Sequence, residues 1–273
     1  MLRDMRDIVR FNNLKKCMVM SNNNIDRRNF LKVLSTGTAA ASTGLLYGCG
    51  GDPKRQGVSQ TGSYLGEVPT DKMTYRTNPH TGDKVSLLGY GCMRWPLRQK
   101  ADGSGEEIDQ EAVNALVDYA IAHGVNYFDV APVYVRGLSE QATGLALSRH
   151  SRDKYFIATK LSTHRPVPEW RTLEGSKGLF EQSLKNLRVD YIDYYLIHGV
   201  GLGGMDDLRK RLYDNGVLDF LLKERKAGRI RNLGWSFHGD VKVFDYLLSL
   251  DIPWDFVQIQ LNYVDWKMLL VGT

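Results

Sequence analysis

Cysteine is scarce in this chain, and long apolar runs are absent from it. The 273 residues include only Cys17, Cys49 and Cys92, which are too few and too scattered for a disulfide framework or for a structural metal site with paired Cys-x-x-Cys ligands. No run of roughly 18 or more apolar residues occurs, although a transmembrane helix needs about 20. The sequence therefore predicts no structural metal and no membrane-spanning helix, while a hydrophobic content of 42% is enough for a sizeable core.

Most of the chain also lacks an excess of charge of either sign. The formal net charge is +5, yet residues 1–48 hold eight basic and three acidic side chains, which leaves 28 of each kind in the remainder. Binding to phosphates needs a basic surface. The remainder of the chain has no net charge, which argues against nucleic acid as a partner.

The beginning of the chain carries the pattern of a targeting segment. Paired arginines, one spacer and Phe-Leu-Lys occupy Arg27–Lys32, and residues 33–48 form a mild apolar stretch rich in Ala, Ser, Thr and Gly. This pattern resembles a twin-arginine export signal, which is a receptor-read address and not part of the fold. An amphipathic helix is the alternative, but the apolar positions form no helical stripe. We expect residues 1–49 to be a leader that directs export to the periplasm or the outer side of the cytoplasmic membrane.

The end of the leader and the next segment set the expected domain boundaries. Residues 46–49, Leu-Tyr-Gly-Cys, resemble a lipoprotein cleavage box in which Cys49 becomes the acylated first residue. The alternative is a small-residue cleavage site with an incidental cysteine, so membrane contact is expected only through lipidation at Cys49. Residues 50–72 have few apolar anchors and predict a flexible tether. The folded domain is expected over residues 73–273.

From residue 73 onward, short apolar runs alternate with one-faced helical patterns. A turn-rich segment at residues 78–82 predicts a hairpin that leads into the first strand. The predicted strands are residues 85–90, 126–130, 155–160, 191–198, 231–236 and 256–260. The predicted helices are one from the N-cap Asp109 to the stop at Gly124, one over 139–149, one around 179–187, one over 217–227 and one over 241–250. This alternation demands parallel strands with helices packed outside them.

Two α/β architectures satisfy that alternation, a doubly wound open sheet and a (β/α)8 TIM barrel. An open nucleotide-binding sheet would carry a glycine-rich phosphate turn after its first strand. Residues 89–94, Gly-Tyr-Gly-Cys-Met-Arg, lack the third glycine and no helix follows directly. The barrel is therefore favoured, and because only six strands fit before residue 273, we expect it to be incomplete, with about six βα units. The glycines of residues 199–204 lack the GK[ST] ending of a phosphate loop and predict a mobile rim loop.

Polar residues occupy the carboxyl ends of five successive predicted strands, where barrels assemble their active sites. These residues are Asp129, with Tyr134 five positions further on, Lys160, His198, Ser236 and Gln258. Each has a structural alternative when taken alone, such as an ion pair between Asp129 and Lys160. Their shared position at one rim favours a catalytic site.

Three segments resemble the aldo-keto reductases. They are residues 126–134 (Asn-Tyr-Phe-Asp-Val-Ala-Pro-Val-Tyr), residues 158–160 (Ala-Thr-Lys) and residues 195–198 (Tyr-Leu-Ile-His). The resemblance covers roughly residues 73–265. It implies an oxidoreductase that uses NADP(H) to reduce a small carbonyl compound, an aldehyde or a ketone. The implied catalytic tetrad is Asp129, Tyr134, Lys160 and His198. The leader and residues 89–94 are most similar to an exported branch with a C-terminal iron-sulfur segment, so a 4Fe-4S cluster is expected only in a longer form.

The implied chemistry accounts for these residue types. Hydride transfer from a nicotinamide leaves a developing alkoxide on the substrate, which needs a proton donor and a hydrogen-bonding environment. Tyr134 would donate the proton, and the ammonium of Lys160 would stabilise the phenolate. Asp129 would keep Lys160 charged and in place. His198 would orient the carbonyl.

The resemblance also implies contacts to cofactor and substrate. The matching positions are Ser236 and Gln258 at the nicotinamide carboxamide, Met93 and Arg94 on the first loop beside the cofactor, and Trp95 at the substrate-pocket wall. Simple packing is the alternative for Trp95. Many family members have asparagine after the serine, where this chain has Phe237 and His238, so one amide contact is not expected here.

Two other functional classes stay open at this point. A catalytically inactive barrel fragment or binding subunit would keep the tetrad but fail to bind NADPH, because the family's last two units supply loops that wrap the pyrophosphate. An exported scaffold that delivers a bound cofactor is the third hypothesis. The substrate, the preference between NADP and NAD, and the oligomeric state do not follow from these segments.

Overall fold

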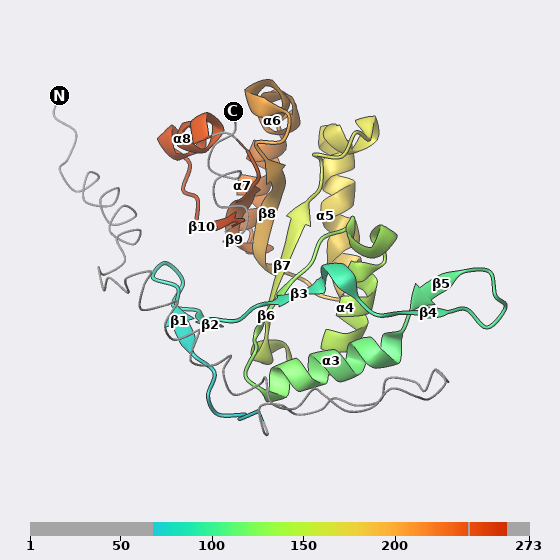
Figure 1. Ribbon diagram of the computed structural model, residues 1–273. Helices are drawn as coiled ribbons and strands as arrows, with labels where there is room; N and C mark the ends of the chain where they lie inside the picture. Colours follow the sequence, from blue (N-terminus) through green and yellow to red (C-terminus); the bar gives the residue numbers. More distant parts are fainter. Residues whose placement is uncertain (1–67, 240, 261–273) are drawn as a thin grey trace, which may run out of the picture. The chain divides into compact units, whose positions relative to one another are not determined.

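The computed structural model of this protein describes residues 68–239 and 241–260 (Figure 1). The predicted leader over residues 1–49 and most of the predicted tether over residues 50–72 lie outside this part of the chain. Export, lipidation at Cys49 and the domain boundaries therefore stay predictions. The described residues form an α/β unit on one six-stranded sheet.

The sheet has the strand order β10-β9-β8-β7-β6-β3, and every neighbouring pair is parallel. Its strands are β3 (Tyr90–Gly91), β6 (Tyr127–Asp129), β7 (Phe156–Leu161), β8 (Ile192–Val200), β9 (Ile230–Phe237) and β10 (Phe256–Ile259). Strands that follow one another along the chain are thus neighbours in the sheet, as in a (β/α)8 barrel. The curled sheet corresponds to part of such a barrel, which confirms the predicted fold class and its six strands (Figure 1).

Helices cover the outer face of the sheet. They are α3 (Gln110–Ala122), α4 (Ser139–Leu147), α5 (Leu173–Leu187), α6 (Gly204–Leu212), α7 (Val217–Lys226) and α8 (Val241–Ser249). Short 3-10 helices complete the connections: η1 (Cys92–Arg94), η2 (Tyr134–Gly137), η3 (Arg152–Lys154) and η4 (Pro168–Arg171). Helix α3 packs on α4, α4 on α5, and α5 on α7. The strand-then-helix reading of the sequence is confirmed for α3, α4, α5, α7 and α8, whereas α6 was not predicted.

The ends of α3 follow the local signals in the sequence. The side chain of Asp109 accepts a hydrogen bond from the backbone N–H of Ala112 at 3.0 Å, which caps the first turn. After the helix, Gly124 has a φ of +85°, a left-handed conformation that favours glycine. The predicted start and stop of this helix are therefore confirmed.

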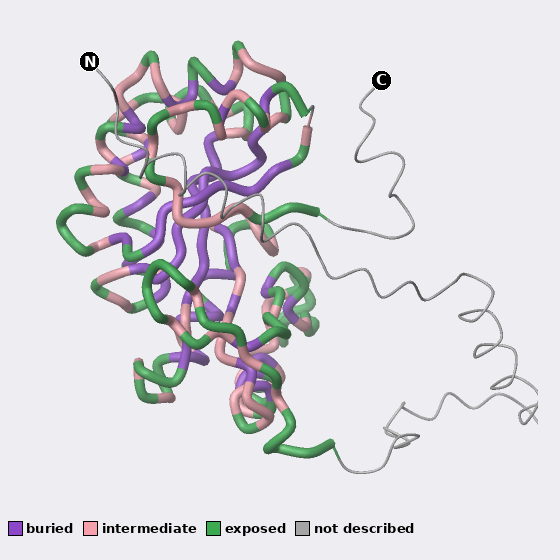
Figure 2. Tube along the Cα trace, turned by 90° about the vertical axis from the view of Figure 1, so that its left-hand side faces the viewer, coloured by how far each residue is buried: buried purple, intermediate pink, exposed green. Residues whose placement is uncertain are grey.

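The central strands are buried on both faces, as parallel strands under helices should be. All nine residues of β8 are buried, and Figure 2 shows the buried residues concentrated along the sheet. On the outer face, Tyr195 and Ile197 belong to one apolar cluster with Phe180 of α5 and Leu221 of α7. This packing holds the strands in place relative to one another, and hence their carboxyl ends.

A β-hairpin closes the inner face near the amino-terminal ends of the strands. The hairpin was predicted, and it consists of β1 (Tyr75–Thr77) paired antiparallel with β2 (Lys84–Ser86). Val85 packs against the inner apolar cluster around Tyr194 and Leu196. The hydroxyl of Tyr194 also donates to the carboxylate of Asp83 at 2.9 Å. The amino-terminal end of the inner face is therefore filled by the chain itself.

The prediction of a first strand over residues 85–90 was wrong. Val85 and Ser86 belong to β2, the chain bends at Leu87 and Leu88, and the first strand of the sheet begins only at Tyr90. Hydrogen bonds of Ser86 explain the bend: its N–H donates to the side chain of Asn126 at 2.8 Å and its hydroxyl to the carbonyl of Leu88 at 2.7 Å. Contacts 40 residues apart in the sequence thus overrode the local apolar pattern.

The prediction of a loop over residues 199–204 was also wrong at both ends. Strand β8 continues through Val200 and α6 begins at Gly204, so only residues 201–203 connect them. A hairpin of β4 (Leu97–Gln99) and β5 (Glu106–Ile108), which projects away from the sheet in Figure 1, was likewise not predicted.

Within the described ranges, no helix has the length and apolar character needed to cross a bilayer. In the described part of the chain, no group of three His, Cys, Asp or Glu side chains lies close enough together to hold a metal ion.

Candidate active site

The alternation of side chains along the strands places the predicted residues on one face. Residues two apart in a strand point to the same side, so Lys160 shares the inner face with Ala158, and His198 shares it with Leu196. The parallel register pairs Asp129 with Ala158, and Lys160 with Leu196. The structure thereby brings Asp129, Lys160 and His198 together at the carboxyl ends of three adjacent strands.

The ammonium of Lys160 is the centre of the site. Its Nζ donates to Oδ1 of Asp129 at 2.6 Å, to the carbonyl of Val130 at 2.9 Å and to the hydroxyl oxygen of Tyr134 at 3.1 Å. The side chain of Lys160 is only 2% exposed, so these contacts replace water around a buried charge. The other carboxylate oxygen of Asp129 is buried without a hydrogen-bond partner in the described part of the chain. The hydrogen bonding of this carboxylate is therefore directed at Lys160.

Tyr134 projects from the turn that follows β6. It opens η2, in which Val135 and Arg136 have φ values of +47° and +56°. A positive φ is rare for a β-branched residue and indicates local strain. The phenol ring packs edge-on to the imidazole of His198, with 5.9 Å between ring centroids. Tyr134 therefore contacts both Lys160 and His198.

His198 is held as a neutral side chain. It is 8% exposed, its Nδ1 lies 2.7 Å from the hydroxyl of Ser162, and the ring of His164 packs edge-on to it at 4.3 Å. Burial, followed by the positive charge of Lys160, lowers the pKa of His198 to about 2. Burial, followed by the charge of Arg211, lowers the pKa of His164 to about 4. Near neutral pH, His198 is thus a hydrogen-bonding group and not a cation.

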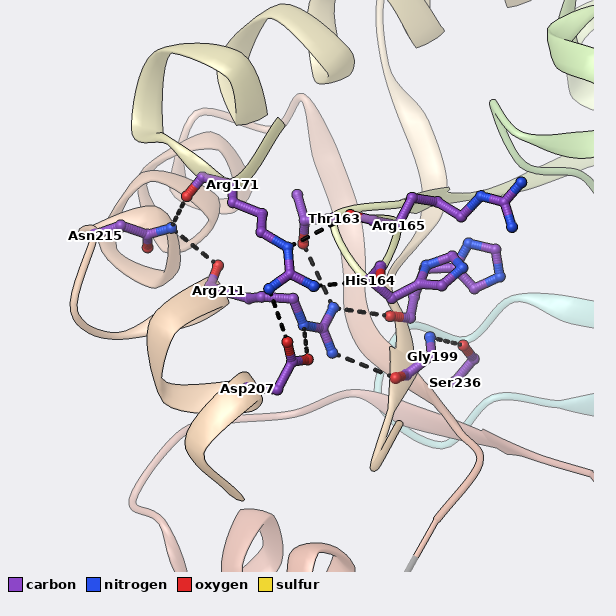
Figure 3. A network of polar contacts seen from close by, with 10 residues as sticks. Thr163, His164, Arg165, Arg171, Gly199, Asp207, Arg211, Asn215 and Ser236 are labelled. Atoms are coloured by element: carbon purple, nitrogen blue, oxygen red, sulfur yellow. Dashed lines mark hydrogen bonds and ion pairs between the residues drawn. The ribbon is translucent and has the colours of Figure 1, made fainter. Parts of the chain in front are cut away.

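A buried arginine supports this part of the rim (Figure 3). Arg211 of α6 is 1% exposed, and its guanidinium donates to the carbonyl oxygens of His198 at 3.1 Å and Gly199 at 3.3 Å. It also donates to Asp207 at 2.7 Å, and Arg171 of η4 pairs with the second oxygen of that carboxylate at 2.9 Å. The end of β8, which includes Gly199 from the predicted rim loop, is thus tied to α6 by charged hydrogen bonds.

Sequence reasoning missed Ser162, His164 and Arg211. A signal existed for Ser162, because a residue two positions after Lys160 lies on the same face of the chain. Arg211 follows two other basic residues, and only the packing of α6 decides which of the three turns inward. His164 lies in a turn, where no periodicity indicates its direction.

The predicted cofactor residues lie near the same rim. Ser236 of β9 is 4% exposed and is aligned with Gln258 of β10 in the register. The hydroxyl oxygen of Ser236 accepts a hydrogen bond from the backbone N–H of Gly199 at 3.0 Å. Gln258, Met93 and Arg94 are exposed. The side chains of these last three residues are accessible, whereas Ser236 is buried, and the roles of all four stay predictions.

Trp95 and Phe237 both pack inside the protein. The indole N–H of Trp95 donates to the hydroxyl of Thr143 at 3.0 Å, its ring stacks on Tyr90 at 5.2 Å, and it is 4% exposed. These are packing contacts, and a place on the substrate-pocket wall stays a prediction. Phe237, which follows Ser236, packs its ring against Trp235, so this position presents no amide.

A second concave region lies at the opposite ends of the strands. It is lined in part by Arg152, Tyr191, Asp193 and Arg231. Both arginines pair with Asp193 and lie over the ring of Tyr191. Asp153 also lines the region, so two arginines face two carboxylates, which indicates a structural cluster and not a catalytic one.

The two buried histidines make a prediction about acid stability. The unfolded chain protonates histidine below pH about 6.5, whereas the folded-state pKa values are about 4 for His164 and about 2 for His198. Between these values the unfolded state binds more protons, so stability present above about pH 6.5 is lost as the pH falls toward each folded-state pKa. We expect each histidine to add up to about 1.4 kcal/mol per pH unit to that loss.

Urea unfolding of the wild type and of His198→Gln at about pH 7.5 and about pH 5 measures this effect. The variant should lose less stability between the two conditions than the wild type. His80→Gln, which removes an exposed histidine, is the matched control. Equal losses in His198→Gln and the wild type would show that His198 is not held neutral in the folded protein.

Comparison with known proteins identifies the family of this chain. Residues 87–269 match the sequence profile of the aldo/keto reductase family. Protein tas of Escherichia coli (strain K12) is 31% identical over 205 residues, which cover 66% of this chain and 56% of that relative. L-galactose dehydrogenase of Arabidopsis thaliana is 29% identical over 196 residues, which cover 70% of this chain and 56% of the enzyme. This chain thus spans little more than half the length of these curated relatives.

A solved structure shares the arrangement of strands and helices. The holo form of an aldo-keto reductase from Bacillus halodurans is 27% identical and superimposes with a TM-score of 0.54, covering 69% of this chain and 58% of that one. The profile match extends over more than half of the chain. On these grounds, this chain belongs to the aldo/keto reductase family.

Proposed function

We propose that this chain carries the catalytic centre of an NAD(P)H-dependent oxidoreductase that reduces the carbonyl of an aldehyde or ketone, with Tyr134 as the proton donor. One observation carries the proposal. The Nζ of Lys160 contacts the carboxylate of Asp129 at 2.6 Å and the phenol oxygen of Tyr134 at 3.1 Å. An ammonium held against a phenol stabilises the phenolate that proton donation leaves behind. Membership of the family supports the same class of reaction.

The residues at the rim fit a nicotinamide carboxamide. The hydroxyl oxygen of Ser236 accepts from the N–H of Gly199, and its own proton has no acceptor among the described residues. This free donor suits a carboxamide oxygen, and the exposed amide of Gln258 in the neighbouring strand can both donate and accept. Ser236 and Gln258 would therefore hold the carboxamide, with Met93 and Arg94 beside it on the first loop.

The chain's own residues would handle the carbonyl oxygen and its proton. A bound reduced nicotinamide supplies the hydride that the carbonyl carbon receives. Tyr134 gives its hydroxyl proton to the oxygen as negative charge develops there, so that the carbonyl becomes an alcohol. Lys160 stabilises the phenolate, and Asp129 keeps the ammonium paired. The neutral imidazole of His198, packed against Tyr134, orients the oxygen by a hydrogen bond.

Cofactor binding tests the proposal most directly. Titration of the purified chain with NADPH and with NADH, followed by the fluorescence of the nicotinamide, should show saturable binding. Turnover of a simple aldehyde or a quinone should depend on Lys160 and be lost in Lys160→Ala. A folded protein that binds neither nucleotide would contradict the proposed function and would support a non-catalytic binding role.

A further inference from the structure

One polar contact of His198 is not used by the chemistry above. The Nδ1 atom of its ring lies 2.7 Å from Oγ of Ser162. Ser162 is fully buried and follows the last residue of β7, two positions after Lys160. It therefore reaches the inner face from the same strand as the ammonium, and it approaches the Nδ1 side of the imidazole.

The direction of this hydrogen bond follows from counting donors and acceptors. A neutral imidazole has one N–H and one bare nitrogen, and a hydroxyl has one proton to donate. If the N–H were on Nδ1, the Ser162 oxygen would accept it, and the hydroxyl proton would need another acceptor. No other partner of this hydroxyl exists among the residues that the structure describes. A fully buried donor without an acceptor is costly, so the hydroxyl donates to a bare Nδ1.

We propose that Ser162 is a positioning residue that fixes His198 in the tautomer carrying its proton on Nε2. With Nδ1 occupied as an acceptor, Nε2 becomes the donor that faces the substrate oxygen. The last step rests on the proposed function, but the tautomer itself does not. Two further contacts hold His198 in place: the ring of His164 packs against its imidazole at 4.3 Å, and the guanidinium of Arg211 donates to its backbone carbonyl at 3.1 Å.

Ring-nitrogen NMR of the full chain, labelled with 15N-histidine, reads the tautomer without any assay of activity. The chain has six histidines, and His198→Gln assigns the signal. We expect one neutral form with a protonated Nε2 and a hydrogen-bonded Nδ1 between about pH 6 and pH 8. In Ser162→Ala the Nδ1 resonance should move toward that of a nitrogen without a hydrogen bond, and Ser162→Thr should restore it.

The matched control is Ser176→Ala. Ser176 is also fully buried, and its hydroxyl makes one hydrogen bond, to the carbonyl of Trp170 at 3.0 Å. This variant loses a buried hydroxyl as Ser162→Ala does, so it should have a similar stability but an unchanged His198 signal. A proton on Nδ1 in the wild type would overturn the proposal, and so would an Nδ1 resonance that is identical in Ser162→Ala.

Kinetics provide the second arm of the test. Ser162→Ala should lower kcat by about 10-fold, while KM for NADPH changes by less than about twofold, because the carbonyl loses an oriented donor and not a binding contact to the nucleotide. Ser162→Thr should recover kcat. A wild type without turnover would refute the proposed function alone, because the NMR signals would still decide the tautomer.

Discussion

Replacing Tyr134 with phenylalanine should lower kcat for carbonyl reduction by about 10²- to 10⁴-fold, the range that a positioned general acid supplies. The substitution removes only the hydroxyl, which lies 3.1 Å from Nζ of Lys160. The ring and its edge-on packing against His198 are kept, and the pairing of Lys160 with Asp129 is not touched. Stability and nucleotide affinity should therefore stay close to those of the wild type. Steady-state kinetics and a urea titration measure both effects.

Tyr194→Phe is the matched control for that experiment. Tyr194 is 4% exposed and also loses a hydrogen-bonded hydroxyl, but its partner is Asp83 near the amino-terminal ends of the strands. It should keep the kcat of the wild type. A Tyr134→Phe enzyme that is as active as Tyr194→Phe would remove Tyr134 from the role of proton donor and leave another group to supply the proton.

Replacing Arg211 with methionine should lower the free energy of unfolding by about 3–5 kcal/mol, because it breaks a buried charged network. The carbonyl oxygens of His198 and Gly199 would lose the guanidinium, Gly199 would keep only the N–H of Leu202, and Asp207 would keep only Arg171. Burial already lowers the pKa of the Arg211 guanidinium, although the carboxylate of Asp207 opposes that shift. Arg211→Lys should recover only part of the loss, since an ammonium cannot reproduce the planar fork that contacts two carbonyls and a carboxylate.

Arg229→Met is the comparison, because Arg229 pairs with Glu181 and Glu224 but is 35% exposed. Its loss should change stability by less than about 1 kcal/mol, as is usual for ion pairs near the surface. Denaturant unfolding of both variants gives the two numbers. If Arg211→Met proved no more destabilising than Arg229→Met, the network in Figure 3 would not support the rim.

Local signals in the sequence accounted for much of the fold. The cap at Asp109, the stop at Gly124 and the strand-then-helix order were predicted from neighbouring residues alone, and the structure confirms them. The failures at residues 85–90 and 199–204 have a different cause. The bend after Ser86 depends on Asn126, and α6 is held against the end of β8 by Arg211, which lies near the carboxyl end of that helix. Such partners are distant in the sequence, so no local pattern reveals them.

The sequence by itself determined which polar side chains stand at the carboxyl ends of the strands, because parallel strands of a barrel present those ends at one rim. That was enough to bring Asp129, Lys160 and His198 to one rim. Only the tertiary structure decided what each group contacts: the three acceptors around Lys160, the hydroxyl of Ser162 on Nδ1 of His198, and the inward turn of Arg211. The physical reason is the distance along the sequence over which each property is decided. The order of strands and helices follows from neighbouring residues, whereas hydrogen-bond partners depend on the register and curl of strands that are tens of residues apart.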